Sequence, residues 1–232
     1  MANPGPDITA APLQVSELFY SIQGESTYAG YPCVFIRLAG CNLRCSYCDA
    51  RYTYEEEPRL MTVEELLAFT RRYPAALVQV TGGEPLVQEQ VYLLLEDLMW
   101  EERLVLLETN GSIGLGRVPG AVVKIMDLKC PDSNMSGRMN LENLKLLTPA
   151  DELKCVISSR SDYEWAVSML RTHIPALEKP TEIKRRVKIL FSPVPERLSP
   201  ELLAQWLLDD GLQVRLQLQL HRLLWPRKTR AF

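Results

Sequence analysis

The sequence is poor in histidine, has no long apolar run and carries no excess of basic residues. Its only histidines are His173 and His221, both far along the chain. No apolar segment is long enough to cross a bilayer, and Met1 to Pro12 lacks the charged start and apolar stretch of a signal peptide. A net charge of −3 gives no broad basic field for nucleic acid or an anionic membrane. We therefore expect a cytoplasmic protein that acts on a small molecule.

The chain has the size and composition of one domain. It contains 232 residues, of which 47% are hydrophobic, and this is enough for one sizeable core. No internal repeat and no low-complexity tract indicates another architecture. We expect a flexible N-terminal arm at residues 1–14 and a single domain at residues 15–232.

Three cysteines lie on one short segment with the spacing C-x3-C-x2-C, namely Cys41, Cys45 and Cys48. They follow the apolar run Val34 to Ala39, which is typical of a strand. Three thiolates can hold three corners of an iron–sulfur cube and leave its fourth iron open to a small molecule. The alternatives are a zinc knuckle, which is closed by four ligands, and three unrelated buried cysteines. The remaining cysteines are expected to be small buried hydrophobes; they are Cys33, Cys130 and Cys155.

Predicted strands alternate with predicted helices along most of the chain. The strands are predicted at residues 34–39, 76–80, 104–107, 122–126, 153–157 and 187–191. The helices are predicted at residues 62–73, 87–103, 162–173 and 200–209, with only a short helical possibility at 141–147. This alternation favours an α/β fold with a parallel sheet of about six strands and reduced helices. Residues 214–221 alternate between polar and apolar and predict one further strand.

Several polar or glycine-containing motifs come directly after predicted strands. They are the cysteine segment, Thr81 to Glu84, Glu108 to Asn110, Asp127 to Lys129 and Ser192 to Pro195. Ligands of parallel sheets bind at the carboxyl ends of the strands, so we expect these motifs to line one site. In that site Glu84 would offer its carboxylate to the ammonium group of a ligand.

For three other features the residues alone leave two alternative roles. Arg37, within the first predicted strand, needs an anion, which is either a substrate carboxylate or the partner of a salt bridge at the rim. Gln23 and Gly24 either bind a flat, hydrogen-bonding molecule or form a plain strand-to-turn transition. His221, at the end of the last predicted strand, either reaches the site or lies at its rim.

The cysteine segment, with Tyr47 just before its last cysteine, resembles the cluster loop of the radical S-adenosylmethionine (SAM) enzymes. The stretch Thr81 to Pro85, with the sequence TGGEP, resembles their GGE motif, whose residues hold the amino group of SAM. The resemblance implies a 4Fe–4S cluster with SAM chelated to its open iron. One electron from the cluster then splits the sulfonium and gives a 5'-deoxyadenosyl radical.

Four features narrow the resemblance to 7-carboxy-7-deazaguanine synthase: the segment Phe19 to Glu25, Arg37, Thr81 and the segment Arg215 to His221. This family implies a partial, shortened TIM-type barrel and typically a homodimer. It implies a lyase that converts 6-carboxy-5,6,7,8-tetrahydropterin to 7-carboxy-7-deazaguanine plus ammonia, in the biosynthesis of queuosine and related 7-deazapurines. The radical abstracts hydrogen from carbon 6 of the pterin, and SAM is re-formed after each turnover. An electron donor such as flavodoxin or ferredoxin is also implied.

The resemblance carries residue roles to matching positions of this sequence. Cys41, Cys45 and Cys48 would ligate the cluster. The implied SAM site consists of Tyr47, Cys48, Asp49, Gly83, Glu84, Asp127, Leu128, Lys129, Ser192, Pro193, Val194 and Pro195. The implied pterin site consists of Ile22, Gln23, Gly24, Arg37, Thr81 and Pro226, with Arg37 matching the substrate carboxylate by charge.

The sequence departs from the family pattern at two places. Many members bind a magnesium ion through a hydroxyl residue directly after Cys-Asp, but Ala50 stands there and offers no oxygen ligand. Either the ion is not used, or nearby oxygens such as that of Thr53 substitute. The chain also continues from Arg227 to Phe232 beyond Pro226, close to the position where other members end and contact substrate.

Two other functions compete with that of the synthase. A radical-activating enzyme of the same superfamily would generate a glycyl radical on a partner protein and would share the cluster loop. Arg37 and the Gln23–Gly24 segment favour the small carboxylated pterin instead. A non-enzymatic metal-binding protein would need a fourth ligand near the cysteines, and the two histidines lie far from them in sequence.

Overall fold

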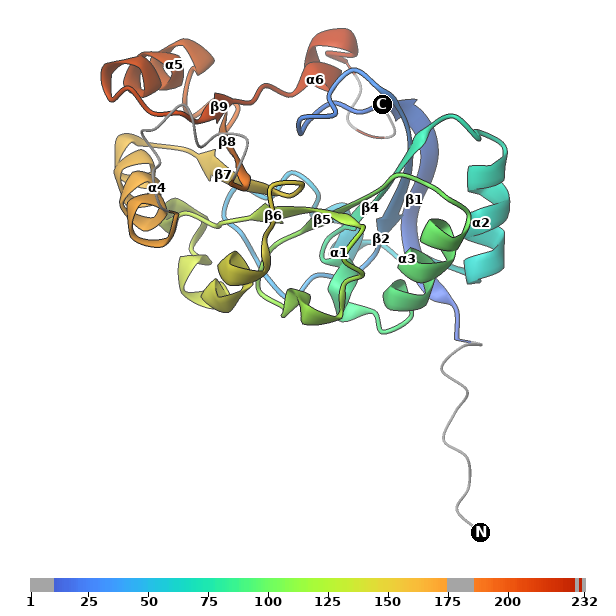
Figure 1. The fold of residues 1–232 in the computed structure, drawn as a ribbon. Coiled ribbons are helices and arrows are strands. Elements are labelled where there is room, and N and C mark those ends of the chain that lie inside the picture. Colours follow the sequence, from blue (N-terminus) through green and yellow to red (C-terminus); the bar gives the residue numbers. More distant parts are fainter. Residues whose placement is uncertain (1–10, 175–185, 228–229, 231–232) are drawn as a thin grey trace.

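The computed structural model describes residues 11–174, 186–227 and 230 (Figure 1). Within these ranges nine strands form one sheet in the order β3-β1-β2-β4-β5-β6-β7-β8-β9. The strands are β1 (Leu13–Ile22), β2 (Pro32–Leu38), β3 (Arg59–Met61), β4 (Leu77–Gly82), β5 (Val105–Thr109), β6 (Val123–Asp127), β7 (Glu152–Ile157), β8 (Lys188–Pro193) and β9 (Arg215–Leu216). From β2 to β9 all neighbouring strands are parallel, whereas β1 is antiparallel to β2 and β3.

The six predicted parallel strands are confirmed as β2, β4, β5, β6, β7 and β8. The sheet curves strongly but has two ends, β3 and β9, so it does not close (Figure 1). This is the partial TIM-type barrel that the sequence predicts. The single-domain organisation expected for residues 15–232 stays a prediction.

The helices lie mostly outside the curved sheet (Figure 1). Those in the described residues are α1 (Tyr52–Glu55), α2 (Val63–Arg71), α3 (Val91–Trp100), α4 (Arg160–His173), α5 (Pro200–Asp209) and α6 (Leu220–Leu224). Two of these helices begin at a side-chain N-cap: Thr62 and Glu65 form a capping box on α2, and Ser199 caps α5.

The helices are reduced as expected, and one is shorter than predicted. Between β6 and β7 the chain makes only short 3₁₀ segments, at Pro131–Ser133, Ser136–Arg138 and Leu141–Leu146. Further 3₁₀ turns lie at Pro85–Val87 and Leu115–Arg117. The helix predicted at 87–103 is α3, and it begins at Val91 because the side chain of Glu84 caps the preceding 3₁₀ turn.

The two faces of the sheet carry different side chains, because successive residues of a strand point to opposite faces. On the outer face Val78, Val80 and Leu107 belong to the main core, together with buried leucines of α3. The inner face has a small apolar cluster of Leu106, Val123 and Ile125, with Tyr28 and Leu77 packed against it. Towards the carboxyl ends of the strands this inner face becomes polar.

The last predicted strand is largely wrong. Residues 214–221 were expected to form one strand, but β9 contains only Arg215 and Leu216, and α6 begins at Leu220. The backbone N–H of Gln217 still donates to Phe191 of β8, but that of Leu220 donates to Gly24 at 2.8 Å. The neighbouring strand ends at Pro193, which has no N–H to continue the ladder, so the chain leaves the sheet.

The N-terminal boundary also differs from the prediction. Leu13 and Gln14 were assigned to a flexible arm, but they belong to β1, and Leu13 is fully buried. Residues 1–10 of the expected arm lie outside the described residues. Among the helices that the structure describes, none has the length and apolar character needed to cross a membrane.

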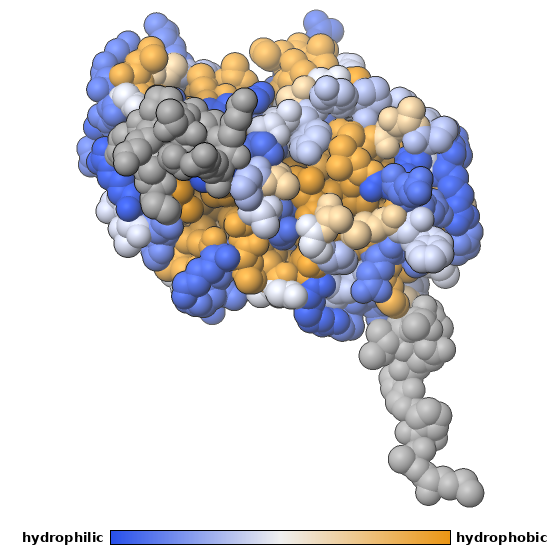
Figure 2. Space-filling view, viewed as in Figure 1, coloured by the Kyte–Doolittle hydropathy of each residue, from blue (hydrophilic) through white to orange (hydrophobic). Residues whose placement is uncertain are grey.

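Hydrophobic residues gather in the middle of the face shown in Figure 2, and also over α5 and α6 at its upper edge. Leu208 of α5 and Leu223 of α6 are exposed there. A pocket of about 520 Å³ lies between the end of β8, the residues that lead into α5, and α6. Its lining includes Leu198, Leu218 and Leu223.

Candidate active site

The cysteine segment leaves the sheet at the end of β2 and is held on both sides. Gly40 adopts a left-handed conformation, with φ of 84°, and its N–H donates to Thr53 at 2.7 Å. On the far side Ser46 bonds to the backbone of Asp132 and Ser133, and the hydroxyl of Tyr47 donates to Val156 of β7 at 3.2 Å. The segment is therefore fixed between the β2 end and the β6–β7 side of the sheet.

The three cysteines of this segment fit an iron–sulfur cube. Cys41, Cys45 and Cys48 are free and partly exposed, and they are close enough to influence one another electrostatically. In the described residues no three His, Cys, Asp or Glu side chains converge on a single-ion site. A cube does not need such convergence, because each thiolate binds a different iron. Burial raises the pKa of both Cys45 and Cys48, and the charge of Lys129 opposes the effect.

The turn after β4 packs directly onto the cysteine segment. Gly83 donates its N–H to Leu38 at 3.2 Å, and Glu84 donates its N–H to Gly40 at 2.9 Å. A Cβ atom on Gly83 would overlap the carbonyl oxygen of Gly40 and lie 2.7 Å from Cβ of Cys41. Glycine is required here because the two backbones approach so closely.

The Glu84 side chain does not face the site as expected. It is fully buried, and its carboxylate accepts hydrogen bonds from the N–H groups of Leu86 and Asn110 and from the Thr109 hydroxyl. Burial raises the pKa of Glu84 to about 7, although these donors oppose the shift. Glu84 therefore joins the β4 turn to the end of β5, and the expected contact of its carboxylate with a ligand's ammonium group stays a prediction.

Asn110 connects the end of β5 to the cysteine segment. Its side-chain amide donates to Oδ1 of Asn42 at 3.0 Å and to Sγ of Cys41 at 3.8 Å. Its Oδ1 accepts from the N–H of Ser112 at 2.9 Å, which fixes the orientation of the amide. Asn110 is thus a donor to one of the proposed cluster ligands.

The end of β6 has an acceptor without a hydrogen-bond donor. Lys129 donates to Oδ2 of Asp127 at 2.6 Å. Oδ1 of the same carboxylate is buried and has no hydrogen-bond partner among the described residues. Asp127 is only 9% exposed, and Nζ of Lys154 forms an ion pair with this oxygen at 3.4 Å.

The turn after β8 lies beside the pocket near α6. Ser192, Pro193 and Pro195 line that pocket, and the N–H of Val194 donates to Ile157 at 2.8 Å. The turn is therefore anchored to the end of β7. The Ser192–Pro195 turn and the Asp127–Lys129 segment follow strands that flank β7.

A chain of polar side chains occupies the inner face near the strand ends. The amide of Gln23 donates to Oε1 of Gln79, and Nε2 of Gln79 donates to Glu108 at 3.0 Å. The hydroxyl of Thr81 donates to the same carboxylate oxygen at 3.0 Å. Two predicted pterin residues, Gln23 and Thr81, are thus brought together through Gln79 and Glu108.

Lys154 of β7 completes this chain. Its Nζ donates to Glu108 at 2.5 Å and to Glu25 at 3.1 Å, and it lies 3.4 Å from Oδ1 of Asp127. Burial raises the pKa of Glu25 and Glu108, but the charge and hydrogen bonds of Lys154, together with Gln219 and His221 at Glu25 and Arg37 at Glu108, lower both below the ordinary value. Gln219 also donates to Glu25 at 2.8 Å.

Arg37 forms a salt bridge, one of its two expected alternatives. Its Nε donates to Glu17 of β1 at 2.8 Å, and Tyr52 donates to the same oxygen at 2.9 Å. Arg37 is paired in register with Thr81 of β4, so it lies beside the polar chain of the inner face. Glu17 accepts from Nε, and the terminal nitrogens of a guanidinium group form a fork suited to a carboxylate.

His221 reaches the predicted pterin segment. A Cβ atom on Gly24 would overlap Nδ1 of His221, so glycine permits the approach of α6. Burial lowers the pKa of His221, whereas the nearby charge of Glu25 raises it. Ile22 ends β1 just before this contact, and Pro226 follows α6 and is exposed.

The two positions considered for magnesium do not fit that ion. Ala50 has no side-chain oxygen. The hydroxyl of Thr53 donates to the carbonyl of Ala50 at 2.7 Å, and Thr53 is 1% exposed. Asp49, the residue before Ala50, is exposed.

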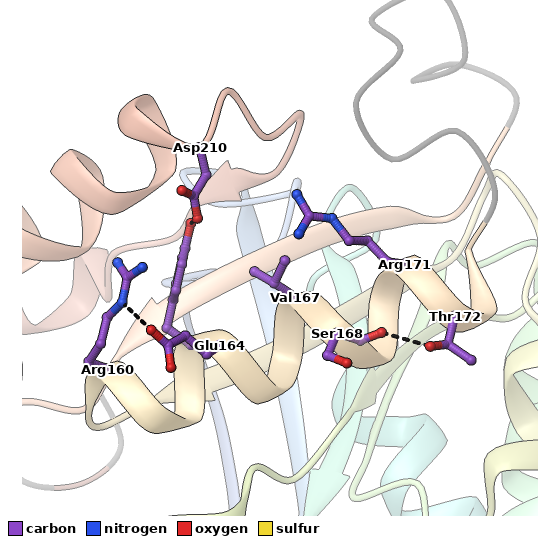
Figure 3. A pocket seen from close by; sticks show the side chains of 8 residues that line it. Arg160, Glu164, Val167, Ser168, Arg171, Thr172 and Asp210 are labelled. Atoms are coloured by element: carbon purple, nitrogen blue, oxygen red, sulfur yellow. Dashed lines mark hydrogen bonds and ion pairs between the residues drawn. The ribbon is translucent and has the colours of Figure 1, made fainter.

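A second pocket, also of about 520 Å³, has a different lining (Figure 3). It is lined along α4, from Arg160 to Thr172, and by Asp210 at the end of α5. Arg160 pairs with Glu164 at 2.9 Å within this lining. None of the predicted site residues lines the pocket, so it is not part of the candidate active site.

Sequence reasoning missed two members of the site, Gln79 and Lys154. Each is a polar residue inside an otherwise apolar strand, which indicates a side chain with a specific partner. Lys154 and Glu152 point to one face of β7, and Cys155 points to the other face. The alternation in the sequence therefore already indicated that this strand has one polar face. Glu25 and Glu108 were named only as parts of motifs, without a role.

The chain is similar to known proteins along nearly all of its length. Residues 35–128 match the Radical SAM superfamily. The chain is 42% identical to a 7-carboxy-7-deazaguanine synthase from Koribacter versatilis, covering 94% of this chain and 100% of that protein. It is 44% identical to a protein of the same name from Chlorobaculum tepidum, covering 96% and 99% respectively. The crystal structure of QueE from Escherichia coli has a TM-score of 0.68 at 21% identity, covering 95% of this chain and 100% of that one, and so supports the fold.

Proposed function

The chain belongs to the 7-carboxy-7-deazaguanine synthase family of radical SAM enzymes, and from this we propose how its strand-end site carries out the family reaction. The enzyme converts 6-carboxy-5,6,7,8-tetrahydropterin to 7-carboxy-7-deazaguanine and ammonia. The comparisons support this lyase over the alternative of a glycyl-radical activating enzyme.

One observation carries the proposal. The cysteine segment packs on the Gly83 turn, and the inner face beside this turn bears a polar chain from Gln23 to Glu108. A site for a cluster with SAM and a site for a flat polar substrate therefore adjoin at the end of β4. This adjacency is what a reaction between SAM and a pterin requires, because the reacting groups must be held close together.

On the SAM side the residues bind and orient. Cys41, Cys45 and Cys48 would hold the cluster, which together with SAM supplies the radical that starts the reaction when both are bound. Oδ1 of Asp127, which lacks a hydrogen-bond donor, supports a contact with a donor group of SAM. Gly83 allows the ligand and the cysteine segment to approach the backbone closely. The remaining proposed contacts are Tyr47, Asp49, Glu84 through its backbone, Leu128, Lys129 and the turn Ser192 to Pro195.

On the substrate side the residues bind the pterin by charge and hydrogen bonds. The terminal nitrogens of Arg37 match the pterin carboxylate, and Glu17 fixes the guanidinium from behind. Gln23, Gly24 and Thr81 lie around the Glu108 carboxylate or beside α6 and would bind the ring, with Ile22 and Pro226 at the edges. These side chains hold the substrate in one orientation and displace water from it.

The reaction acts on a small molecule and needs a one-electron reductant. We propose that flavodoxin or ferredoxin supplies the electron and that the enzyme works as a homodimer. We also propose a cytoplasmic location, because six free cysteines are best kept reduced there. Magnesium is left out of the proposed site, since Ala50 and Thr53 do not offer it a ligand.

The test is reconstitution without oxygen. The protein should bind about four irons per chain and, with SAM and a reductant, form the deazaguanine product from the pterin, as detected by mass spectrometry. The Cys45→Ala variant, which lacks one proposed ligand, should lose both the cluster and the product. Reductive cleavage of SAM without product from this pterin would leave the superfamily assignment standing and remove the specific activity.

A further inference from the structure

Lys154 is a buried cation with three carboxylates around it. The residue is 6% exposed, and its Nζ lies 2.5 Å from Glu108, 3.1 Å from Glu25 and 3.4 Å from Asp127. These carboxylates come from β5, from the loop after β1 and from β6, whereas Lys154 comes from β7. A lone ammonium group at this depth would be strongly unfavourable, so the surrounding carboxylates are what keep it charged.

The position of Lys154 relates it to both proposed ligand sites. Asp127, with which it is paired in register, belongs to the proposed SAM site. Glu108 accepts hydrogen bonds from Gln79 and Thr81, and Glu25 follows the pterin segment at Gln23 and Gly24. Lys154 therefore lies between the SAM side and the pterin side.

The pterin ring explains why ionised carboxylates would be useful at this place. Its amino group and ring N–H groups are hydrogen-bond donors, and an ionised carboxylate is an acceptor only. Hydrogen bonds to an ionised acceptor are roughly twice as strong as neutral ones. A protonated Glu108 or Glu25 would instead present a hydroxyl group to these donors.

We propose that Lys154 is a positioning residue that keeps Glu108 and Glu25 ionised and oriented toward the pterin. The proposal rests on the proposed function, because it takes the pterin as the ligand of the inner face. Lys154 acts through the carboxylates and need not touch the substrate.

The other charges around this group come from each neighbouring element. Arg37 of β2 faces Glu108, and His221 of α6 faces Glu25. Lys129, after β6, is bonded to Asp127. The charges of Glu25 and Glu108 repel one another. The cluster thus contains three carboxylates, those of Glu25, Glu108 and Asp127, and two lysine ammonium groups, those of Lys154 and Lys129.

The sign of the pH effect follows from these charges. Burial alone raises the pKa of Glu108 and of Glu25; Lys154 is the largest opposing influence, and together with Gln219 and His221 at Glu25 and Arg37 at Glu108 it lowers both. Without the ammonium group, burial and mutual repulsion would raise both pKa values above the ordinary range. A larger fraction of the Glu108 and Glu25 carboxyl groups would then be protonated at neutral pH. Because protonation would weaken pterin binding, activity with the pterin would recover only as the pH rises.

The experiment compares Lys154→Met with Lys154→Arg in the reconstituted enzyme. A matched control is Lys124→Met, because Lys124 is also buried and paired with a carboxylate, Asp151 at 3.0 Å, but lies near the start of β6. Steady-state kinetics give KM for the pterin and for SAM across a pH series. Calorimetric titration of the pterin into the SAM-bound enzyme gives Kd without turnover, and thermal unfolding reports folding.

We expect Lys154→Met to weaken pterin binding and to raise its KM by roughly tenfold to a hundredfold. KM for SAM should change by less than about threefold, since Lys129 still neutralises Asp127. The acid limb of kcat/KM for the pterin should move up by about one pH unit or more. Lys154→Arg should restore most of the affinity and the wild-type pH profile, and Lys124→Met should leave both unchanged.

Four outcomes would overturn the inference. A folded Lys154→Met enzyme with wild-type pterin affinity and pH profile would overturn it while leaving the proposed function intact. Equal losses in Lys154→Met and Lys124→Met would reduce the effect to general destabilisation. A wild-type enzyme that forms no product from the pterin would remove the proposed function and the inference together.

If Lys154→Met does not fold, Glu25→Gln serves instead, because it removes one carboxylate from the pair without leaving the ammonium group unpaired. A Glu25→Gln enzyme with unchanged pterin Kd would also overturn the proposal.

Discussion

Arg37 and Glu17 face one another across β1 and β2, and Nε of Arg37 donates to the Glu17 carboxylate at 2.8 Å. This bond fixes one side of the guanidinium, and the planar fork of its terminal nitrogens is suited to the pterin carboxylate. Arg37→Lys keeps the charge but loses the fork. We expect it to raise KM for the pterin roughly tenfold or more, with KM for SAM within about threefold of wild type. Steady-state kinetics with each substrate varied in turn will measure both constants.

The Glu17→Gln variant tests the positioning part of this argument. It keeps the shape of the side chain but weakens the hold on Arg37, so its pterin KM should lie between those of wild type and Arg37→Lys. Arg59→Lys, on the exposed edge strand β3, is the matched control and should change neither constant. Equal increases in both constants for Arg37→Lys would count against a contact with the pterin carboxylate.

Gly83 offers a second prediction, because a Cβ atom there would overlap the Gly40 carbonyl and crowd Cys41. Gly83→Ala should push the cysteine segment away from the β4 turn and reduce the iron content after reconstitution by about half or more. Gly120→Ala is the matched control, since a Cβ atom on Gly120 meets nothing within 4 Å. Iron analysis and the visible absorption of the cluster measure the effect, and full iron content in Gly83→Ala would contradict it.

The sequence predicted that the site motifs gather at one edge of the sheet, for a local reason. Each site motif follows its strand directly in the chain, and parallel strands bring their carboxyl ends together. The Gly83 turn and the cysteine segment agree with this expectation, since the N–H of Glu84 donates to Gly40 at 2.9 Å.

The features that the sequence did not give depend on contacts between distant residues. Lys154 meets Glu108 and Glu25 only because β5, β6 and β7 lie in one register, as in the pairing of Asp127 with Lys154. The local sequence of one strand does not determine its register with its neighbours. The failed strand at residues 214–221 has the same origin, since its alternation was correct but β8 offers a partner only as far as Phe191. The side chain of Glu84 was likewise assigned to a ligand because its partners Thr109 and Asn110 are 25 and 26 residues away.

Asn110 gives a third prediction, on the electronic properties of the cluster. Its amide lies 3.8 Å from Sγ of Cys41, and hydrogen bonds to cluster sulfurs stabilise the reduced, more negative state. Asn110→Ala should therefore shift the reduction potential to more negative values, by an amount on the order of tens of millivolts. A redox titration followed by electron paramagnetic resonance measures the shift.

The control for Asn110 is Ser112→Ala. Ser112 bonds to Oδ1 of Asn110, so its hydroxyl can be removed while the amide donor to Cys41 remains. We expect its potential to stay close to that of wild type. A potential that does not move in Asn110→Ala, with the cluster fully loaded, would show that this amide does not act on the thiolate.

Glu84 gives a fourth prediction, which concerns stability rather than catalysis. Its carboxyl group is fully buried, and burial raises its pKa from the ordinary 4.5 to about 7. Between these two values the folded protein holds a proton that the unfolded chain has released. The free energy of unfolding should therefore fall as the pH rises through this window, by up to about 3 kcal/mol. Glu84→Gln cannot titrate, so this part of the pH dependence should disappear.

Urea unfolding of the cluster-free protein between pH 4.5 and pH 8 measures the Glu84 effect. The useful quantity is the difference between wild type and Glu84→Gln at each pH, because Glu25 and Glu108, whose pKa values are lowered, act in the opposite direction in both proteins. This difference should favour wild type most at the acid end of the series and decline toward pH 8. A constant difference for Glu84→Gln would mean that Glu84 is already ionised in the folded protein at pH 4.5, held so by the hydrogen bonds from Leu86, Thr109 and Asn110.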